Sequence, residues 1–380
     1  MRVLHFYKTA FPDTMGGVEQ AINQIARGAR KRGVEVDVLS LTRQTGAGTM
    51  VIDGYRAHRA RLDFEIQSTG FSSSAVLQFA RLARKADVIH YHFPWPFMDV
   101  VHFLTRTHKP ALVTYHSDII RQQTLLRLYT PLKRKFLESM DHIVATSPNY
   151  LSTSDVLKRY LEKVSVIPIG LDKSTYPEAT PERIDSWRAR FGSRFFLFVG
   201  VIRYYKGLHI LIEAARKTDY PVVIVGAGPI EAELRAQAER LGATNVHFLG
   251  YVQTEDKVAL LRACLGIVFP SHLRSEAFGI SLLEGAMYGK PMISSEIGTG
   301  TTYINIDGET GLVVPPGDAG ALRDAMHALW RQPALAERLG RQAEARYWKH
   351  FTSESMVDDY VHLYETLIRR NRGRLCKRLP

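Results

Sequence analysis

The feature of this sequence that most constrains its fold is a repeated alternation of short apolar segments with longer amphipathic segments. The short segments are rich in Val, Ile, Leu and Phe, as buried strands are, and helical periodicity follows most of them. Such alternation predicts parallel sheets whose successive strands are joined by helices. Because the pattern runs through both halves of the chain, we expect an α/β fold with two doubly wound sheets.

The expected elements fall into two sets. In the first half, we expect strands at 3–7, 35–41, 88–92, 112–115, 143–145 and 165–167, and helices near 17–32, 74–85, 120–139 and 149–160. In the second half, we expect strands at 195–199, 222–225, 246–249, 266–269, 291–294 and 312–314, and helices near 207–216, 230–241, 255–262, 280–288, 319–330 and 334–347. The connecting segment 171–180 contains Asp172 and Pro177 and has no strong periodicity. We therefore expect a first domain at 1–171 and a second at 181–350.

Composition places the chain among ordinary globular proteins. A length of 380 residues is sufficient for two domains, each with its own core. The two cysteines are Cys264 and Cys376, and the second lies in a basic tail, which argues against a structural disulfide. The first residues read as a buried strand rather than a signal peptide. No apolar run approaches the roughly 20 residues that span a bilayer. The cysteine usage fits a reducing compartment, so we expect a cytoplasmic protein.

The net charge of +12 is distributed unevenly along the chain. Residues 1–170 carry +9, whereas residues 171–350 carry +1. A basic first half predicts an anionic partner, for which nucleic acid, an anionic membrane surface and a lipid-diphosphate acceptor are candidates. The segment 119–137 interleaves cations with leucines and aromatic residues and contains no carboxylate between Arg121 and Lys135. It fits a basic amphipathic helix on an anionic membrane and, equally, a helix packed on the core.

An anion site is predicted in the second half, around Glu276 and Glu284. Seven residues separate these carboxylates, and the glycine of a Phe278-Gly279 turn lies between them, before an apolar helical segment that begins near Ile280. Glycine allows backbone to approach a ligand closely, and the free N–H groups of a helix start attract negative charge. The carboxylates themselves would repel phosphate, but they accept strong hydrogen bonds from hydroxyl groups. A sugar nucleotide has both kinds of group.

The spacing of Glu276 and Glu284 resembles the E-x7-E signature of retaining glycosyltransferases of the GT-B fold, particularly glycosyltransferase family 4. Other motifs occur in the family's order over roughly residues 1 to 350. They are Met15-Gly16-Gly17-Val18-Glu19, Tyr115-His116-Ser117, Ile167-Pro168-Ile169-Gly170-Leu171-Asp172, Lys206-Gly207, Gly226-Ala227-Gly228-Pro229 and Gly308-Glu309-Thr310-Gly311. The resemblance implies two Rossmann-like domains that face a central cleft, with a last helix, about 353–370, returning to the first domain.

The resemblance also implies roles for individual residues. As catalytic residues it implies Glu276 and His116, which would contact the transferred sugar, and Lys206, which would stabilise the leaving diphosphate. The family's Arg after the strand-ending glycine is replaced here by Val201, and Arg203 is the candidate to take its place. The donor-binding set it implies consists of Gly16, Gly17, Arg203, Lys206, Phe278, Gly279, Ile280 and Glu284, with Glu284 on the ribose hydroxyls.

The sequence gives little indication of a metal site. No Asp-x-Asp pair is present, and that motif holds the divalent ion in the other large glycosyltransferase fold. His90 and His92 lie two apart on one face of an expected strand, but no third ligand is evident in the sequence. We therefore expect a metal-independent enzyme without a cofactor, in which Lys, Arg and helix N-termini neutralise the diphosphate.

The segment 296–305 resembles a subgroup of bacterial O-polysaccharide mannosyl- and D-rhamnosyltransferases. This resemblance implies GDP-mannose or GDP-D-rhamnose as the donor and a lipid-diphosphate-linked glycan as the acceptor, at the inner face of the cytoplasmic membrane. UDP-sugars remain open, because no base-reading motif is legible. A sugar-nucleotide epimerase shares the fold, but the E-x7-E pattern with Lys206 argues against it. A nucleic-acid-binding protein is the remaining alternative, and the cations are not clustered with stacking aromatic residues.

Overall fold

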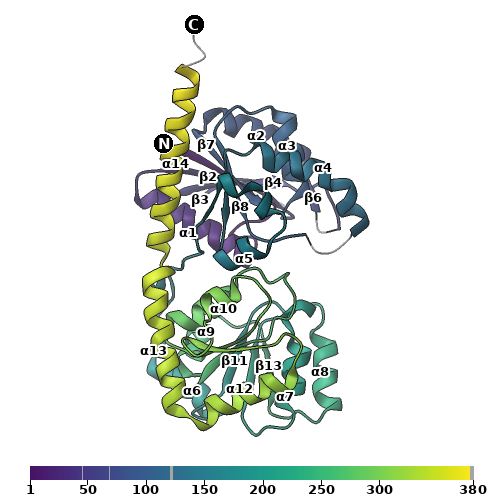
Figure 1. Cartoon of the computed structure of the whole chain (residues 1–380), viewed down its shortest axis with the longest axis vertical. Helices are drawn as coiled ribbons and strands as arrows, with labels where there is room; N and C mark the ends of the chain where they lie inside the picture. Colours follow the sequence, from purple (N-terminus) through teal and green to yellow (C-terminus); the bar gives the residue numbers. More distant parts are fainter. Residues whose placement is uncertain (45, 68, 120–122, 377–380) are drawn as a thin grey trace. The chain divides into compact units, whose positions relative to one another are not determined.

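The computed structural model describes residues 1–44, 46–67, 69–119 and 123–376 and contains two compact units (Figure 1). Unit 1 comprises Met1–Gly170 and Ser353–Pro380, and unit 2 comprises Leu171–Thr352. Each unit has a largely parallel sheet joined by helices. The prediction of two doubly wound α/β sheets is therefore confirmed.

The sheet of unit 1 has the strand order β10-β9-β8-β7-β1-β2-β4-β3. Its neighbouring strands pair in parallel, except that β3 pairs with β4 in antiparallel fashion. The chain moves outward from β1 in one direction and returns to β7 on its other side, so the strand order reverses between β1 and β7. The strands are β1 (Arg2–Phe6), β2 (Glu35–Thr42), β3 (Gly48–Ile52), β4 (Tyr55–Arg61), β7 (Val88–Phe93), β8 (Ala111–Tyr115), β9 (His142–Ala145) and β10 (Val164–Val166), and a separate hairpin is formed by β5 (Phe64–Ile66) and β6 (Thr69–Phe71).

The helices of unit 1 differ from the expected set in two places. A single helix was expected at 149–160, but the structure has α5 and then a 3-10 helix, because Ser154 adopts extended backbone and donates its hydroxyl to Asp118. Helix α3 was not expected, and 120–122 of the expected helix 120–139 lie outside the described residues. The helices are α1 (Gly17–Lys31), α2 (Ser73–Lys85), α3 (Pro96–Thr105), α4 (Gln123–Ser139), α5 (Pro148–Thr153), η1 (Leu157–Lys163) and α14 (Ser353–Cys376).

Helix α14, the long yellow helix of Figure 1, packs on α1 and β7 of unit 1. The close approach to α1 occurs at Gly28, where a Cβ atom would lie 2.4 Å from Cγ2 of Val357. Arg32 of α1 forms an ion pair with Asp358 of α14. The apolar face of α14 buries Val357, Tyr360 and Tyr364. The last helix of the chain is thus part of the core of unit 1.

The sheet of unit 2 is parallel throughout its six strands, in the order β13-β12-β11-β14-β15-β16. This is the strand order of the dinucleotide-binding fold, with its topological switch point between β11 and β14. The strands are β11 (Phe196–Val199), β12 (Val222–Val225), β13 (Val246–Gly250), β14 (Gly266–Phe269), β15 (Met292–Ser295) and β16 (Gly311–Val314). Their positions agree with the six strands expected from the sequence.

The helices of unit 2 also agree with the expected set, apart from α6 and the short α11, which were not expected. They are α6 (Pro181–Phe191), α7 (Leu208–Ala215), α8 (Glu231–Arg240), α9 (Thr254–Ala263), α10 (Ile280–Met287), α11 (Thr301–Ile304), α12 (Ala319–Arg331) and α13 (Pro333–His350), with short 3-10 turns η2 (Lys173–Thr175) and η3 (Tyr204–Lys206). Among the described residues of both units, no helix is long and apolar enough to cross a membrane.

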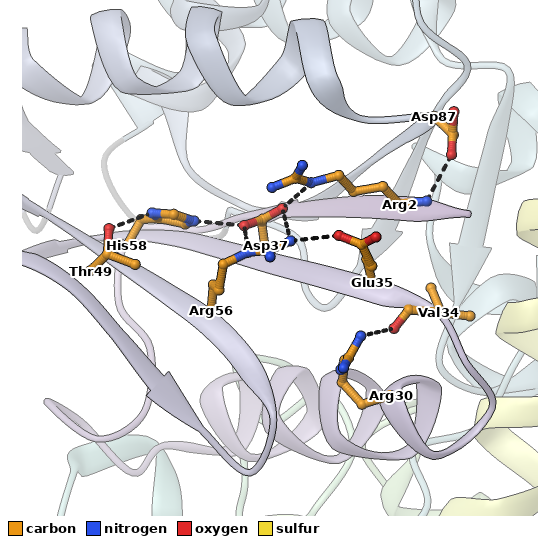
Figure 2. Close-up of polar contacts among 9 residues, drawn as sticks. All are labelled: Arg2, Arg30, Val34, Glu35, Asp37, Thr49, Arg56, His58 and Asp87. Atoms are coloured by element: carbon orange, nitrogen blue, oxygen red, sulfur yellow. Dashed lines mark hydrogen bonds and ion pairs between the residues drawn. The ribbon is translucent and has the colours of Figure 1, made fainter.

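Strand β4 was missed because it is rich in cations, and a buried carboxylate explains how such a strand enters the sheet. Asp37 of β2 is 1% exposed and accepts hydrogen bonds from Arg2 (2.6 Å), Arg56 (2.8 Å) and His58 (2.7 Å) (Figure 2). Burial alone would raise the pKa of Asp37, but the hydrogen bonds from His58, Arg56 and Arg2 lower it well below its usual value. The charge on Asp37 therefore stabilises the folded sheet.

We predict that Asp37→Asn destabilises the protein and removes part of its acid sensitivity. Because the pKa of Asp37 is lower in the folded than in the unfolded chain, its contribution is complete above the unfolded pKa and is lost as the pH falls through the folded pKa. Loss of a hydrogen-bonded partner of this kind costs about 1–3 kcal/mol in the free energy of unfolding. Urea unfolding from pH 7 to pH 3 measures both effects.

The matched control is Glu35→Gln, which removes a neighbouring carboxylate that also pairs with Arg56 but is exposed (Figure 2). We expect little change in stability from this variant. Equal destabilisation by both substitutions, or an unchanged pH dependence in Asp37→Asn, would contradict this account.

Candidate functional site

The predicted site residues of unit 2 lie on two segments that follow neighbouring strands at the switch point of the sheet, and Ile280 and Glu284 are in the helix that ends the second segment. One segment begins with the loop after β11 and the other with the loop after β14. Gly207, with a φ of +70°, lies where the two loops meet, and a Cβ atom there would be 2.0 Å from the carbonyl oxygen of Pro270. Gly308 has a similar φ of +69° but has no atom within 4 Å of such a Cβ. Close approach, as well as backbone conformation, therefore requires glycine at position 207.

Lys206 and Glu276 form an ion pair across these two loops. Each side chain is only 11% exposed. The Nζ atom of Lys206 also lies 4.6 Å from the ring centroid of Phe269, and the hydroxyl of Ser271 is 3.4 Å from the same Glu276 oxygen. The ring and the carboxylate fix the direction of the ammonium group. An ammonium has three N–H donors, so donors remain for a further anion.

Helix α10 begins at the predicted turn and is fastened to the end of β11. Gly279 precedes the helix with a φ of +99°, which favours glycine, and no side chain caps the helix start. The hydroxyl of Ser281 donates to the carbonyl oxygen of Val199 at 2.6 Å. Phe278 is buried, and Gly300 allows backbone to pack against its ring. The turn therefore places the N–H groups at Ile280 beside the end of β11.

Glu284 lies one turn inside α10 and has two partners that the sequence did not reveal. Its Oε1 atom accepts hydrogen bonds from Nζ of Lys257 at 2.7 Å and from the hydroxyl of Tyr176 at 2.9 Å. The side chain of Glu284 is 4% exposed, so this carboxylate is held in place and desolvated. Lys257 and Tyr176 are 27 and 108 positions away in the sequence, and no local pattern marks either residue.

Arg203 differs from Lys206 in its surroundings. It is exposed at the start of η3, and the part of the chain that the structure describes contains no ion-pair partner for it. Lys206, three residues later, is the cation of this loop that reaches Glu276. The loop after β11 thus presents one fixed cation and one solvated cation.

The predicted glycine loop of unit 1 is organised by Glu19. Gly16 precedes α1 in extended backbone, and Gly17 is the first residue of the helix. The carboxylate of Glu19 accepts hydrogen bonds from the hydroxyls of Thr9 at 2.7 Å and Thr14 at 3.0 Å. A Cβ atom at Gly16 would lie 2.4 Å from this carboxylate. Glu19 therefore shapes the loop between β1 and α1, and Gly16 makes room for it.

His116 lies just after β8 in unit 1 and belongs to a buried cluster of histidines. Its Nε2 atom is 3.0 Å from Nδ1 of His92, and Nε2 of His92 is 3.0 Å from Nδ1 of His5. Burial lowers the pKa of His5 and of His116 to about 3, and it holds the pKa of His90 and His92 well below its usual value. These imidazoles are therefore neutral at neutral pH.

The structure supplies the third histidine that the sequence did not show beside His90 and His92. Ring nitrogens of His5, His90 and His92 lie within 4.8 Å of one another. Both nitrogens of His90 are hydrogen-bonded, to the hydroxyls of Tyr364 at 2.8 Å and of Thr114 at 2.7 Å, and both nitrogens of His92 contact other histidines. Hydrogen bonds thus account for the orientation of His90 and His92.

Two family descriptions match the two halves of the chain. Residues 15–175 match Glycosyltransferase Family 4, and residues 180–346 match Glycosyl transferases group 1. The matched regions contain the glycine loop and His116 on one side, and Lys206, Glu276 and Glu284 on the other.

Two curated relatives match over nearly their whole length. The chain is 63% identical to the D-rhamnosyltransferase WbpZ of Pseudomonas aeruginosa, over 93% of both chains. It is 48% identical to the O-antigen chain mannosyltransferase C of Escherichia coli, over 97% of this chain and 99% of the relative.

Solved structures show the same fold at low sequence identity. Sucrose-phosphate synthase from Thermosynechococcus elongatus aligns with a TM-score of 0.82 and 21% identity, over 97% of this chain and 99% of that one. Anabaena HepE, in complex with UDP-glucose, aligns with a TM-score of 0.77 and 20% identity, over 96% of this chain and 100% of that one. On the family matches and the identity to curated relatives, this chain is a glycosyltransferase and belongs to glycosyltransferase family 4.

Proposed function

We propose that this enzyme transfers mannose or D-rhamnose from a GDP-sugar to a lipid-diphosphate-linked glycan, with retention of configuration at the anomeric carbon and without a metal ion. The product would be a surface polysaccharide of the O-antigen type. The names of the two relatives, a D-rhamnosyltransferase and an O-antigen chain mannosyltransferase, support this choice of sugar and pathway. GDP as the nucleotide, retention and metal independence rest on the family resemblance.

The observation that carries the proposal is the Lys206–Glu276 pair beside the start of α10. In glycosyl transfer, negative charge develops on the leaving diphosphate as the bond to the sugar breaks. A cation already oriented in a poorly solvated site stabilises that charge without having to reorganise. Lys206 is such a cation, and Glu276 is a carboxylate at the same place that can accept hydrogen bonds from sugar hydroxyls.

Glu284 is suited to a different part of the donor. Its carboxylate is fixed by Lys257 and Tyr176 and is almost fully buried. A ribose presents two neighbouring hydroxyls, and Oε2 of Glu284, the oxygen that Lys257 and Tyr176 do not contact, can accept charge-assisted hydrogen bonds from them. Lys257 offsets the negative charge, so the nucleotide phosphates meet less repulsion from this residue. Glu284 would therefore bind the nucleotide equally in the ground state and in the transition state.

We predict that Glu284→Ala mainly weakens donor binding, whereas Glu276→Ala mainly lowers turnover. Loss of a charge-assisted hydrogen bond at Glu284 should raise the donor Kd about 10- to 100-fold. Titration calorimetry with GDP-mannose, GDP-D-rhamnose and UDP-glucose measures binding, and the release of the nucleotide measures turnover. Glu337→Ala, which removes an exposed carboxylate of α13, is the control. Wild-type kinetics in both variants with every donor would contradict the assignment.

We predict that Lys206→Ala lowers kcat on the order of 10²- to 10³-fold. We also predict that the wild-type enzyme keeps its full activity in EDTA. Lys206→Arg keeps the charge and should recover part of the rate, and Lys217→Ala removes an exposed cation of the same unit as a control. Initial rates at saturating donor, with and without chelator, provide the measurement. A strict requirement for Mg²⁺ or Mn²⁺ would argue against a mechanism in which Lys206 stabilises the leaving group.

We also propose that unit 1 docks reversibly on an anionic membrane, which would bring the enzyme to its lipid-linked acceptor. The support is the charge of +9 over residues 1–170, together with α4. On α4, Arg127, Arg134 and Lys135 are exposed, and the neighbouring Leu128 is 78% exposed.

The structure corrects the expected amphipathic face of this segment at two positions. Phe136 is buried in the core of unit 1, so it is not available to lipid. Lys133 is partly buried, and desolvation lowers its pKa although Asp118 and Asp99 attract its charge. Arg121 lies outside the described residues. The exposed cations of α4 therefore define the docking surface.

We predict that replacing Arg127, Arg134 and Lys135 with Gln releases the protein from anionic vesicles and leaves donor binding intact. Each cation near an anionic surface contributes about 1 kcal/mol, so the loss should approach 100-fold and should shrink with added salt. The control replaces Arg81, Arg84 and Lys85, three exposed cations of α2, and changes the net charge equally. Sedimentation with neutral and anionic vesicles tests this, and equal loss in both triple variants would contradict a local surface.

A further inference from the structure

Four buried histidines of unit 1, His5, His90, His92 and His116, lie in a continuous row on one face of the sheet because of strand register. His5 on β1 lies opposite His90 on β7, and His92 on β7 lies opposite Thr114 on β8. Residues in register on parallel strands point to the same face of a sheet, as do residues two apart on one strand. His116, two residues beyond Thr114, continues this row past the end of β8. The ring planes of His5 and His92 differ by 16° and those of His92 and His116 by 20°, with ring nitrogens 3.0 Å apart in each pair, so neighbouring rings lie nearly parallel.

The hydrogen bonds between these three rings must all run in the same direction. A neutral imidazole has one N–H donor and one bare nitrogen acceptor. Both nitrogens of His92 face a histidine nitrogen at 3.0 Å, so His92 donates to one neighbour and accepts from the other. Only two arrangements satisfy both contacts. In one, the donors point from His116 toward His5. In the other, they point from His5 toward His116.

The two ends of the row decide between these arrangements. The Nε2 atom of His5 is buried and has no hydrogen-bond partner within the described residues. If the donors pointed toward His5, this atom would carry an N–H group sealed from any acceptor. If the donors point toward His116, the Nε2 atom of His5 carries only a lone pair. Among buried backbone groups, N–H groups without acceptors are rarer than unsatisfied acceptors. We apply the same preference to the imidazole nitrogen of His5, so the second arrangement is favoured. It leaves the N–H group of His116 on Nδ1.

The other end of the row is open. His116 has a small exposed fraction. Its Nδ1 atom has no hydrogen-bond partner among the described residues and is not fully buried. A ligand can therefore reach this nitrogen. His90 stands apart from the row in hydrogen bonding, because its own nitrogens pair with Tyr364 and Thr114.

We propose that His92 and His5 are positioning residues that fix His116 in the Nδ1–H tautomer, so that His116 presents a hydrogen-bond donor rather than a base. This inference rests on the proposed function for the identity of the ligand, which is the transferred sugar. With Nδ1–H outward, His116 donates to a ring or hydroxyl oxygen of that sugar. It takes no proton from the acceptor hydroxyl, because the lone pair of its Nε2 atom is occupied by the N–H of His92.

Nitrogen-15 NMR of histidine-labelled protein tests the tautomer directly, because the shifts of N–H and bare imidazole nitrogens differ widely. His116 is assigned by comparison with His116→Gln. We expect Nδ1–H in the wild type and a shift toward Nε2–H, the form preferred by histidine free in water, in His92→Leu and His5→Phe. His92→Gln should retain Nδ1–H, since an amide also has one donor end and one acceptor end. A bare Nδ1 in the wild type, or an unchanged tautomer in His92→Leu and His5→Phe, would overturn the proposal.

Kinetics separate a positioning role from a purely structural one. His92→Leu should lower kcat about three- to tenfold, the value of one hydrogen bond, while donor Kd stays unchanged and His92→Gln restores most of the rate. His90→Gln is the matched control, because it perturbs an equally buried histidine that is not hydrogen-bonded to His5, His92 or His116, and it should leave the tautomer and kcat unchanged.

The two proposals fail in different ways. If His116→Ala keeps wild-type turnover with every donor, the catalytic assignment of His116 is wrong. The wild-type NMR spectrum then still decides whether His92 and His5 fix the tautomer of His116. If His116→Ala abolishes turnover but the wild type shows a bare Nδ1, only the positioning inference is wrong. Should His92→Leu fail to fold, the wild-type spectrum and His5→Phe decide the question.

Discussion

The direction of the strands in the two parallel sheets is the constraint on which the rest of the structure depends. Each strand releases the chain at its carboxyl end, so the loops that follow the strands of one sheet gather at one edge. At the switch point of unit 2, the loop after β11 brings Lys206 to Glu276, which follows β14. In unit 1, the same rule places the glycine loop after β1 and His116 after β8. The strand directions therefore determine which loops can bring functional side chains together.

Residues near the amino ends of the strands in unit 1 contribute to the stability of the fold. Asp37 and its cationic partners lie toward the amino ends of β1 and β2, where Arg2 begins the first strand (Figure 2). His5 is only three residues further along β1, yet it belongs to the histidine row. At one end, the buried carboxylate of Asp37 keeps its charge because Arg56 and Arg2 pair with it, whereas at the other end burial keeps the imidazoles neutral. Substitutions at the two ends should thus affect different properties.

The sequence predicted the fold well because alternation and apolar runs are local signals. It missed β4 because Arg56 and His58 look like surface residues until Asp37 is known to face them. It identified Glu284 but not Lys257 and Tyr176, since these contacts depend on how distant elements pack. It likewise paired His90 with His92, which are neighbours on one strand. His5 joins them only through the register of β1 against β7.

The two units orient their polar groups by different physical means. In unit 2, fixed charges are held by opposite charges, so Lys206 and Glu276 position one another, as do Lys257 and Glu284. In unit 1, His116 is oriented through neutral rings, and burial does two things at once. It makes protonation costly, and it makes an unsatisfied N–H costly, so the row of rings has one preferred direction. Unit 1 thus presents a neutral group whose direction is fixed by its neighbours, and unit 2 presents a cation fixed by a carboxylate.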